Sequence, residues 1–290
     1  MNNKVPIITL CLLLTFIICS SWGFYAHRYI NEMAIYTLPK TLYKFYSQNS
    51  QYIIDHSTDP DKRRGLIKNE SQKHFIDLDN YYKPNLQHPP FTWQEVNEIY
   101  PEEIINENGT LPWNLLNYLK RLTQAFKEKN KQKILKLSAD LGHYISDACV
   151  PLHTTSNYNG QLTGQEGIHG LWESRIPELF TNTYNIKVNR AKYISDPYNY
   201  IWSTIFSSFK LVDEVLKKEK QLNDNFDLDK KYSVEKRGKR IILNFSKDYS
   251  YAYDTIMNQM VKKRMSASIE ALGSLWLTAW VNAGQPELDF

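Results

Sequence analysis

The sequence predicts an all-α protein, a single-domain multi-helix bundle with long loops. Apolar residues recur at three- and four-residue spacing in three segments, residues 112–130, 131–147 and 250–284, which is the periodicity of amphipathic helices. No segment of comparable length alternates apolar and polar residues as a half-buried strand does. Residues 65–112 and 154–170, rich in Asn, Pro, Gly and Gln, are expected to form the loops.

The expected helices have recognisable ends. Pro112 suits the first turn of the segment 112–130, and Gly284 followed by Pro286 ends the last helix. A further apolar stripe consists of Trp202, Phe206 and Phe209. The sequence contains no Pro/Gly/Ser-rich linker and no repeat at a solenoid period, so we expect one domain.

The first 21 residues have the pattern of a secretory signal peptide. Lys4 precedes an apolar run from Val5 to Ile18, and small residues follow up to Ser21. The run is shorter than the roughly 20 residues of a transmembrane helix. We therefore expect cleavage to leave a domain of residues 22–290, exported to a periplasm or outside the cell. An uncleaved signal that anchors the chain in a membrane is the alternative.

Composition argues against a disulfide framework and a nucleic-acid-binding stripe. Cys149 is the one cysteine beyond the signal, so a core or bound metal must stabilise the domain. The formal net charge is only +4, and basic residues are interspersed with acidic ones at 127–136 and 227–240. This mixture indicates solvated helix faces and a loop.

Five of the seven histidines lie near other groups that bind metal. They are His27, His74, His143, His153 and His169. His143 and Asp147 are four residues apart, as are His169 and Glu173, and side chains at that spacing project from one side of a helix. Each pair alone is most often a surface feature, but several coincide in this chain. Imidazole nitrogen and carboxylate oxygen are ligands that zinc accepts.

The helix that carries His143 and Asp147 also has an apolar face. Leu141 and Ile145 lie about 200° around the helix axis from that pair, at about 100° per residue. One face can therefore pack while the other supplies ligands to an interior cavity, as in metal-binding bundles. Inward polar groups without a partner would cost about 1–3 kcal/mol each, and a cation would remove that cost.

Four motifs follow one another along the chain. They are WGFYAH at 22–27, HFID at 74–77, HYISDACVPLH at 143–153 and HGLWE at 169–173. In this order they resemble the zinc-dependent phospholipases C and the single-strand-specific nucleases of fungi and plants, which form one superfamily. Any one motif is weak, whereas four with fitting internal spacings are specific. Residues beyond Glu173 contribute only a helical pattern to this resemblance.

The resemblance implies three zinc ions at an interior trinuclear site. One would be held by Asp59, His74, His143 and Asp147, a second by His153, His169 and Glu173, and a third by the Trp22 amine and carbonyl, His27 and a bridging Asp147. Signal cleavage would free the Trp22 amine for coordination.

The sequence departs from the family pattern in a few places. Asp61 is an alternative to Asp59 as a ligand. We prefer Asp59, because its separation from His74 resembles the nuclease spacing. Ala26 replaces a common glycine. Glu173 resembles the final ligand of the phospholipases, whereas the nucleases usually carry Asp.

The resemblance implies hydrolysis of a phosphodiester by a zinc-activated hydroxide, of phospholipase C type. A single-strand-specific nuclease or 3′-nucleotidase is the alternative, and a non-catalytic secreted zinc-binding protein is a third hypothesis. Asp77 and Asp147 are the candidate catalytic carboxylates, with capping as the other role for Asp77. Arg63 or Arg64, Phe75 and Tyr158 are candidate contacts to a phospholipid or to single-stranded nucleic acid. No stable protein partner is implied.

Overall fold

The computed structural model describes residues 23–81, 89–238 and 240–289. Its α-helices are α1 (Phe24–Ile35), α2 (Lys40–Gln48), α3 (Ser50–His56), α4 (Asp59–Arg63), α5 (Trp93–Ile99), α6 (Glu102–Glu107), α7 (Leu111–Lys127), α8 (Lys131–Ala148), α9 (Ile168–Gly170), α10 (Ile176–Phe180), α11 (Pro197–Phe209), α12 (Val212–Asn225), α13 (Lys247–Ile256) and α14 (Met260–Asn282). Short 3₁₀ turns are η1 (Ser71–His74), η2 (Leu78–Tyr81), η3 (Pro151–Thr154), η5 (Thr181–Thr183) and η6 (Leu228–Lys230), and η4 (Leu171–Arg175) is a π-helical turn. The strands β1 (Tyr232–Arg237) and β2 (Arg240–Phe245) form one hairpin.

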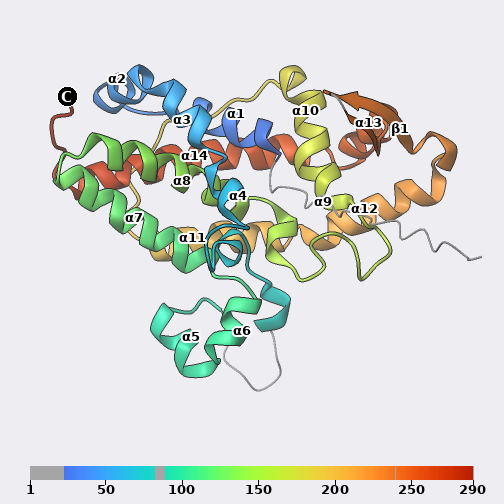
Figure 1. The fold of residues 1–290 in the computed structure, drawn as a ribbon, viewed down its shortest axis with the longest axis horizontal. Helices are drawn as coiled ribbons and strands as arrows, with labels where there is room; N and C mark the ends of the chain where they lie inside the picture. Colours follow the sequence, from blue (N-terminus) through green and yellow to red (C-terminus); the bar gives the residue numbers. More distant parts are fainter. Residues whose placement is uncertain (1–22, 82–88, 239, 290) are drawn as a thin grey trace, which may run out of the picture.

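The predicted all-α fold class is confirmed. Helices α1, α7, α8 and α14 pack side by side along the long axis (Figure 1). At their centre the Trp276 ring of α14 stacks on Tyr46 at 4.4 Å between centroids, and its indole N–H donates to the Ser138 carbonyl of α8. The apolar face of α8 thereby holds the opposite face at a fixed position inside the bundle. No helix in the described ranges is long and apolar enough to span a membrane, and the expected signal, residues 1–21, lies outside those ranges.

Three expectations about secondary structure were wrong. The helix expected over 250–284 is broken between α13 and α14, where Asn258 and Gln259 have positive φ values of 51° and 54°. The loop expected over 65–112 contains α5 and α6, and α5 begins with a capping box between Thr92 and Glu95. The stretch 227–240, expected as a helix face or loop, contributes β1 and the start of β2.

Gly142 allows α1 and α8 to approach closely. A Cβ at this position would lie 2.1 Å from Asn31 Oδ1 and 2.7 Å from its Cγ. Both helices carry side chains of the interior site, so this close approach sets the distance between them.

We expect Gly142→Ala to lower the free energy of unfolding by about 1–3 kcal/mol, as overpacking does. The sign is diagnostic, because Ala in an ordinary helix interior is better than Gly by about 1 kcal/mol. Gly65→Ala is the control, since a Cβ there meets nothing within 4 Å. Urea denaturation measures both, and a neutral or stabilised Gly142→Ala would show that the helices can separate freely.

Candidate metal centre

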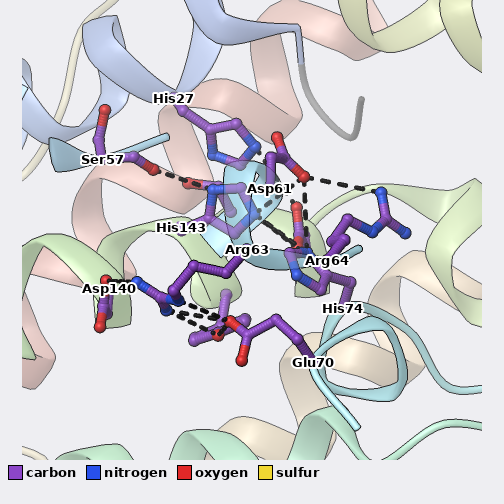
Figure 2. Close-up of polar contacts among 12 residues, drawn as sticks. His27, Ser57, Asp61, Arg63, Arg64, Glu70, His74, Asp140 and His143 are labelled. Carbon is purple, nitrogen blue, oxygen red and sulfur yellow. Dashed lines mark hydrogen bonds and ion pairs between the residues drawn. The ribbon is translucent and has the colours of Figure 1, made fainter. Parts of the chain in front are cut away.

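Four segments bring histidines and carboxylates together inside the bundle. His27 comes from α1, Asp61 from α4, His74 from the end of η1, and His143 with Asp147 from α8. Figure 2 shows the first four of these around one point. All five side chains are buried. The His143 and Asp147 face of α8, expected from sequence to point inward, does so.

The first cluster consists of Asp61, His74, His143 and Asp147, whose donor atoms lie close together. His74 Nδ1 lies 2.9 Å from Asp147 Oδ2 and 3.0 Å from His143 Nε2. His143 Nε2 lies 3.4 Å from Asp147 Oδ2. Asp61 Oδ1 lies 3.8 Å from His74 Nδ1 and 3.6 Å from His143 Nε2. A tetrahedral zinc site with bonds of about 2.1 Å has edges of about 3.4 Å. His74, His143 and Asp147 are close enough together to hold one ion, and Asp61 lies within ligand distance of His27 and His143.

The two oxygens of Asp147 face different partners. Oδ2 belongs to the first cluster, whereas Oδ1 lies 3.5 Å from His27 Nε2. The His27 ring stacks on His143 with centroids 3.8 Å apart. This geometry suits a carboxylate that bridges two ions. Trp22, the other predicted ligand beside His27, lies outside the described residues, and its role stays a prediction.

A second cluster consists of His153, His169 and Glu173. His153 Nε2 lies 3.1 Å from Glu173 Oε2, and His169 Nε2 lies 2.9 Å from Oε1. Glu173 Oε1 nevertheless has no hydrogen bond from any residue that the structure describes. Two ligands of one ion approach in this way without bonding to each other. The wide π turn η4 carries Glu173, and such turns are frequent at functional sites.

Backbone carbonyls fix the orientation of three histidines. In each, ring atom Nδ1 donates to a carbonyl and Nε2 faces its cluster: His143 to Ser57 at 2.9 Å, His153 to His74 at 2.6 Å and His169 to Tyr158 at 3.1 Å. Histidines that bind metals are held in this manner, because the second hydrogen bond selects the tautomer. The bond from His153 to His74 also ties the two clusters together.

The electrostatics of the first cluster favour a bound cation. Burial raises the pKa of the Asp61 carboxyl to about 8, and both of its oxygens lack a hydrogen bond within the described part of the chain. Burial, together with neighbouring positive charges, lowers the pKa values of His74 and His143 well below the usual range. Neutral imidazoles are ready ligands. A divalent cation would keep the Asp61 carboxylate ionised, so the residues present fit zinc.

Glu173 in the second cluster behaves differently. Burial alone would raise its pKa, but the charges of His169 and His153 outweigh this effect and hold the pKa at about 2. Its carboxylate is therefore ionised at neutral pH, between two imidazole nitrogens. The second cluster offers one anionic and two imidazole donors to a cation.

The structure places Asp61, and not the preferred Asp59, beside the histidines. Asp59 accepts hydrogen bonds from His56 Nδ1 at 2.5 Å and Lys62 Nζ at 2.8 Å, at the protein surface. Residues two apart on a helix point about 200° away from each other. Because α4 turns Asp59 outward, Asp61 lies in the cluster, where Arg64 Nη1 approaches its carboxylate at 3.6 Å.

Arg63, predicted to contact substrate, points away from the ligands (Figure 2). Its guanidinium donates to Glu70 at 3.0 Å and to Asp140 Oδ1 at 3.0 Å. The Tyr144 hydroxyl donates to the same Glu70 oxygen at 2.5 Å. Arg63 thus ties α4, the approach to η1 and α8 together, directly beside the ligand each segment carries. The buried carboxylates of Glu70 and Asp140 were missed. The available signal was the acid Asp140 among apolar residues of α8, whereas Glu70 lies in a polar stretch that gave none.

Of the remaining candidates, Asp77 and Phe75 follow His74 in the sequence, and Tyr158 contacts His169. Asp77 is half-buried, and burial together with the charge of Asp79 raises its pKa to about 7. Phe75 is half-buried next to His74. Tyr158 is 53% exposed, with its ring 5.9 Å from the His169 ring. A carboxyl that can gain or lose a proton near neutral pH therefore lies three residues from a histidine of the first cluster.

Comparison with known proteins yields similarity to solved structures. No protein-family profile matches the chain, and no curated protein matches it. Among solved structures the chain is similar to the alpha-toxin of Clostridium perfringens, from avian strain SWCP, with a TM-score of 0.46 and 15% sequence identity. The alignment covers 92% of this chain and 64% of the alpha-toxin chain, so this chain spans less than two thirds of that protein. What the centre binds is therefore inferred from its own donor atoms.

We expect Asp61→Asn to weaken stabilisation by zinc and Asp59→Asn to leave it unchanged. Bound metal stabilises the folded chain by mass action, and the amide removes one of the two anionic donors of the first cluster, Asp61 and Asp147. The measurement is the shift in thermal midpoint on adding zinc to chelator-treated protein, together with zinc content after gel filtration. Loss of the shift in Asp59→Asn but not in Asp61→Asn would reverse the assignment.

We expect Arg63→Met to lower the free energy of unfolding by about 3 kcal/mol, because it leaves Glu70 and Asp140 buried with one fewer cation. Lys73 and Lys136 still contact these carboxylates at 2.7 and 2.8 Å, which keeps the loss at the lower end. Arg28→Met removes an exposed pair with Asp55 and should cost less than about 1 kcal/mol. Equal losses in urea denaturation would contradict the role of Arg63 as a clamp.

Proposed function

We propose that this protein is an exported zinc-dependent hydrolase of phosphodiester bonds, of phospholipase C type. The observation that carries the proposal is the second cluster, where three side chains of the described chain, His153, His169 and Glu173, converge as two imidazole donors and one carboxylate donor. Zinc sites of hydrolases commonly have three protein ligands and an open position, whereas structural zinc sites are closed by four. This favours an enzyme over a non-catalytic zinc-binding protein.

The chain supplies two further sets of donors next to that cluster. Asp61, His74, His143 and Asp147 would hold one ion, and His27 with Asp147 and the Trp22 amine and carbonyl would hold another. When bound, neighbouring zinc ions withdraw charge from phosphate oxygens and lower the pKa of water. The buried carboxylates and carbonyl-oriented imidazoles hold these donors in place before any substrate arrives.

Other residues would handle protons and substrate. The Asp77 carboxyl, with a pKa of about 7, can accept or donate a proton at its oxygen near neutral pH. Arg64 balances the charge of Asp61. Tyr158 lies at the rim of the second cluster, where its exposed ring can contact the part of the substrate beyond the phosphate. The same contacts would serve a nucleotide, so a nuclease or 3′-nucleotidase is the alternative.

We expect the zinc-loaded chain, processed to begin at Trp22, to hydrolyse phosphatidylcholine faster than single-stranded DNA, RNA or 3′-AMP. His169→Gln should lower kcat/KM by about a hundredfold or more, since even partners of metal ligands contribute 10–100-fold. His56→Gln is the matched control, because His56 lies outside both clusters and bonds to Asp59.

The outcomes separate the hypotheses. Faster cleavage of DNA, RNA or 3′-AMP than of phosphatidylcholine would favour the nuclease or 3′-nucleotidase hypothesis over the phospholipase hypothesis. Zinc binding without hydrolysis across a broad phosphoester panel would reject the enzyme. Equal activity of His169→Gln and the wild type would show that the second cluster is not the site of hydrolysis.

A further inference from the structure

The outer face of the β1–β2 hairpin exposes aliphatic side chains. The antiparallel register pairs Val234 with Leu243 and Lys236 with Ile241, so these residues share one face. Val234, Ile241 and Leu243 are 73%, 76% and 68% exposed. Isolated exposed aliphatic residues are normal, but a contiguous group of them marks an interaction surface. Figure 1 shows the hairpin at one end of the molecule, beside α10 and α13.

The hairpin segment is strongly basic. Residues 230–247 contain seven Lys and Arg and one acidic residue, Glu235. The carboxylate of Glu235 is engaged by the guanidinium of Arg175 in a two-pronged ion pair. Lys236 is exposed on the aliphatic face itself. In the described part of the hairpin, Lys230 and Lys231 pair with Asp227 and Glu219. The face therefore combines exposed aliphatic side chains with the positive charge of Lys236.

We propose that this hairpin is a docking surface for membranes that contain anionic phospholipid. Aliphatic side chains enter the boundary between head groups and acyl chains, while nearby lysines are attracted to anionic head groups. Tyr232, 42% exposed on the same face, has the apolar ring and polar tip suited to that boundary. A single-stranded nucleic acid would instead need a row of aromatic faces for stacking, and aliphatic residues predominate here.

The hairpin is connected directly to the second cluster. Arg175, two residues after Glu173, donates from Nε to the Phe245 carbonyl at 2.9 Å and holds Glu235. The Phe245 ring lies against Gly167, where a Cβ would stand 3.4 Å from it. Gly167 is two residues before His169. A hairpin bound to a membrane would therefore keep this cluster close to lipid head groups. The benefit of this closeness for catalysis rests on the proposed hydrolase, whereas the docking proposal does not.

The test is co-sedimentation of the processed full chain with vesicles of phosphatidylcholine, with and without phosphatidylglycerol. We expect tighter binding to the anionic vesicles, at least tenfold weaker binding by Ile241→Ser/Leu243→Ser, and weaker binding by Lys236→Glu. Leu66→Ser is the matched control, because Leu66 is an aliphatic residue 85% exposed away from the hairpin. Circular dichroism and thermal melting verify that each variant is folded.

Hydrolysis is measured in parallel on a water-soluble phosphodiester and on vesicle lipid. The double variant should retain activity on the soluble substrate and lose at least tenfold on vesicles. Unchanged vesicle binding by the folded double variant would overturn the docking proposal, even if hydrolysis persists. Vesicle binding without any hydrolysis would reject only the proposed function. If the double variant lost binding to single-stranded DNA but not to vesicles, the docking proposal would be overturned in favour of a nucleic acid. If the wild type were a dimer and the double variant a monomer with unchanged vesicle binding, it would be overturned in favour of a second copy.

Discussion

The burial of carboxylates among imidazoles at the centre of the bundle is the constraint on which the rest of the structure depends. Asp61, Asp147 and Glu173 are acids with buried side chains, and an uncompensated buried charge is expensive. Beside Asp61, the imidazoles of His74 and His143 are kept neutral by burial and do not supply positive charge. A divalent cation would supply positive charge. The lone pairs of the carboxylates and imidazoles, which point toward one another, would coordinate it. Folding and metal binding are therefore expected to be coupled, as in other sites whose ligands come from distant segments.

The scaffold around the centre holds the ligands from behind. Arg63 joins Glu70 and Asp140, and each of these three residues lies within seven positions of a ligand on its own segment. The carbonyls of Ser57 and His74 orient two imidazoles in the same way. Backbone carbonyls and buried ion pairs therefore orient the donor side chains. The geometry of the donors is set before a cation binds.

The fold class and the inward face of α8 could be predicted because helical periodicity records which side of a long helix packs. The same periodicity fails on α4, a five-residue helix with too few apolar residues to indicate which of Asp59 and Asp61 faces inward. The role of Arg63 was equally invisible, because its partners are up to 77 positions away in the sequence. The hairpin was missed for a different reason. Each strand has only six residues, and β2 contains three consecutive apolar residues in place of a two-residue alternation. Its aliphatic residues Val234, Ile241 and Leu243 are also exposed, contrary to the usual burial of apolar side chains.

The π turn η4 connects the interior of the molecule to that outward face. Within its five residues, Glu173 points to the second cluster, while Arg175 holds the hairpin through Glu235 and the Phe245 carbonyl. A π turn winds more widely than an α turn, which changes the angle between side chains two positions apart. The same turn therefore contacts the hairpin and supplies a donor of the second cluster, with one residue between the two side chains. A surface bound at the hairpin would lie on the side of the molecule that this turn links to the centre.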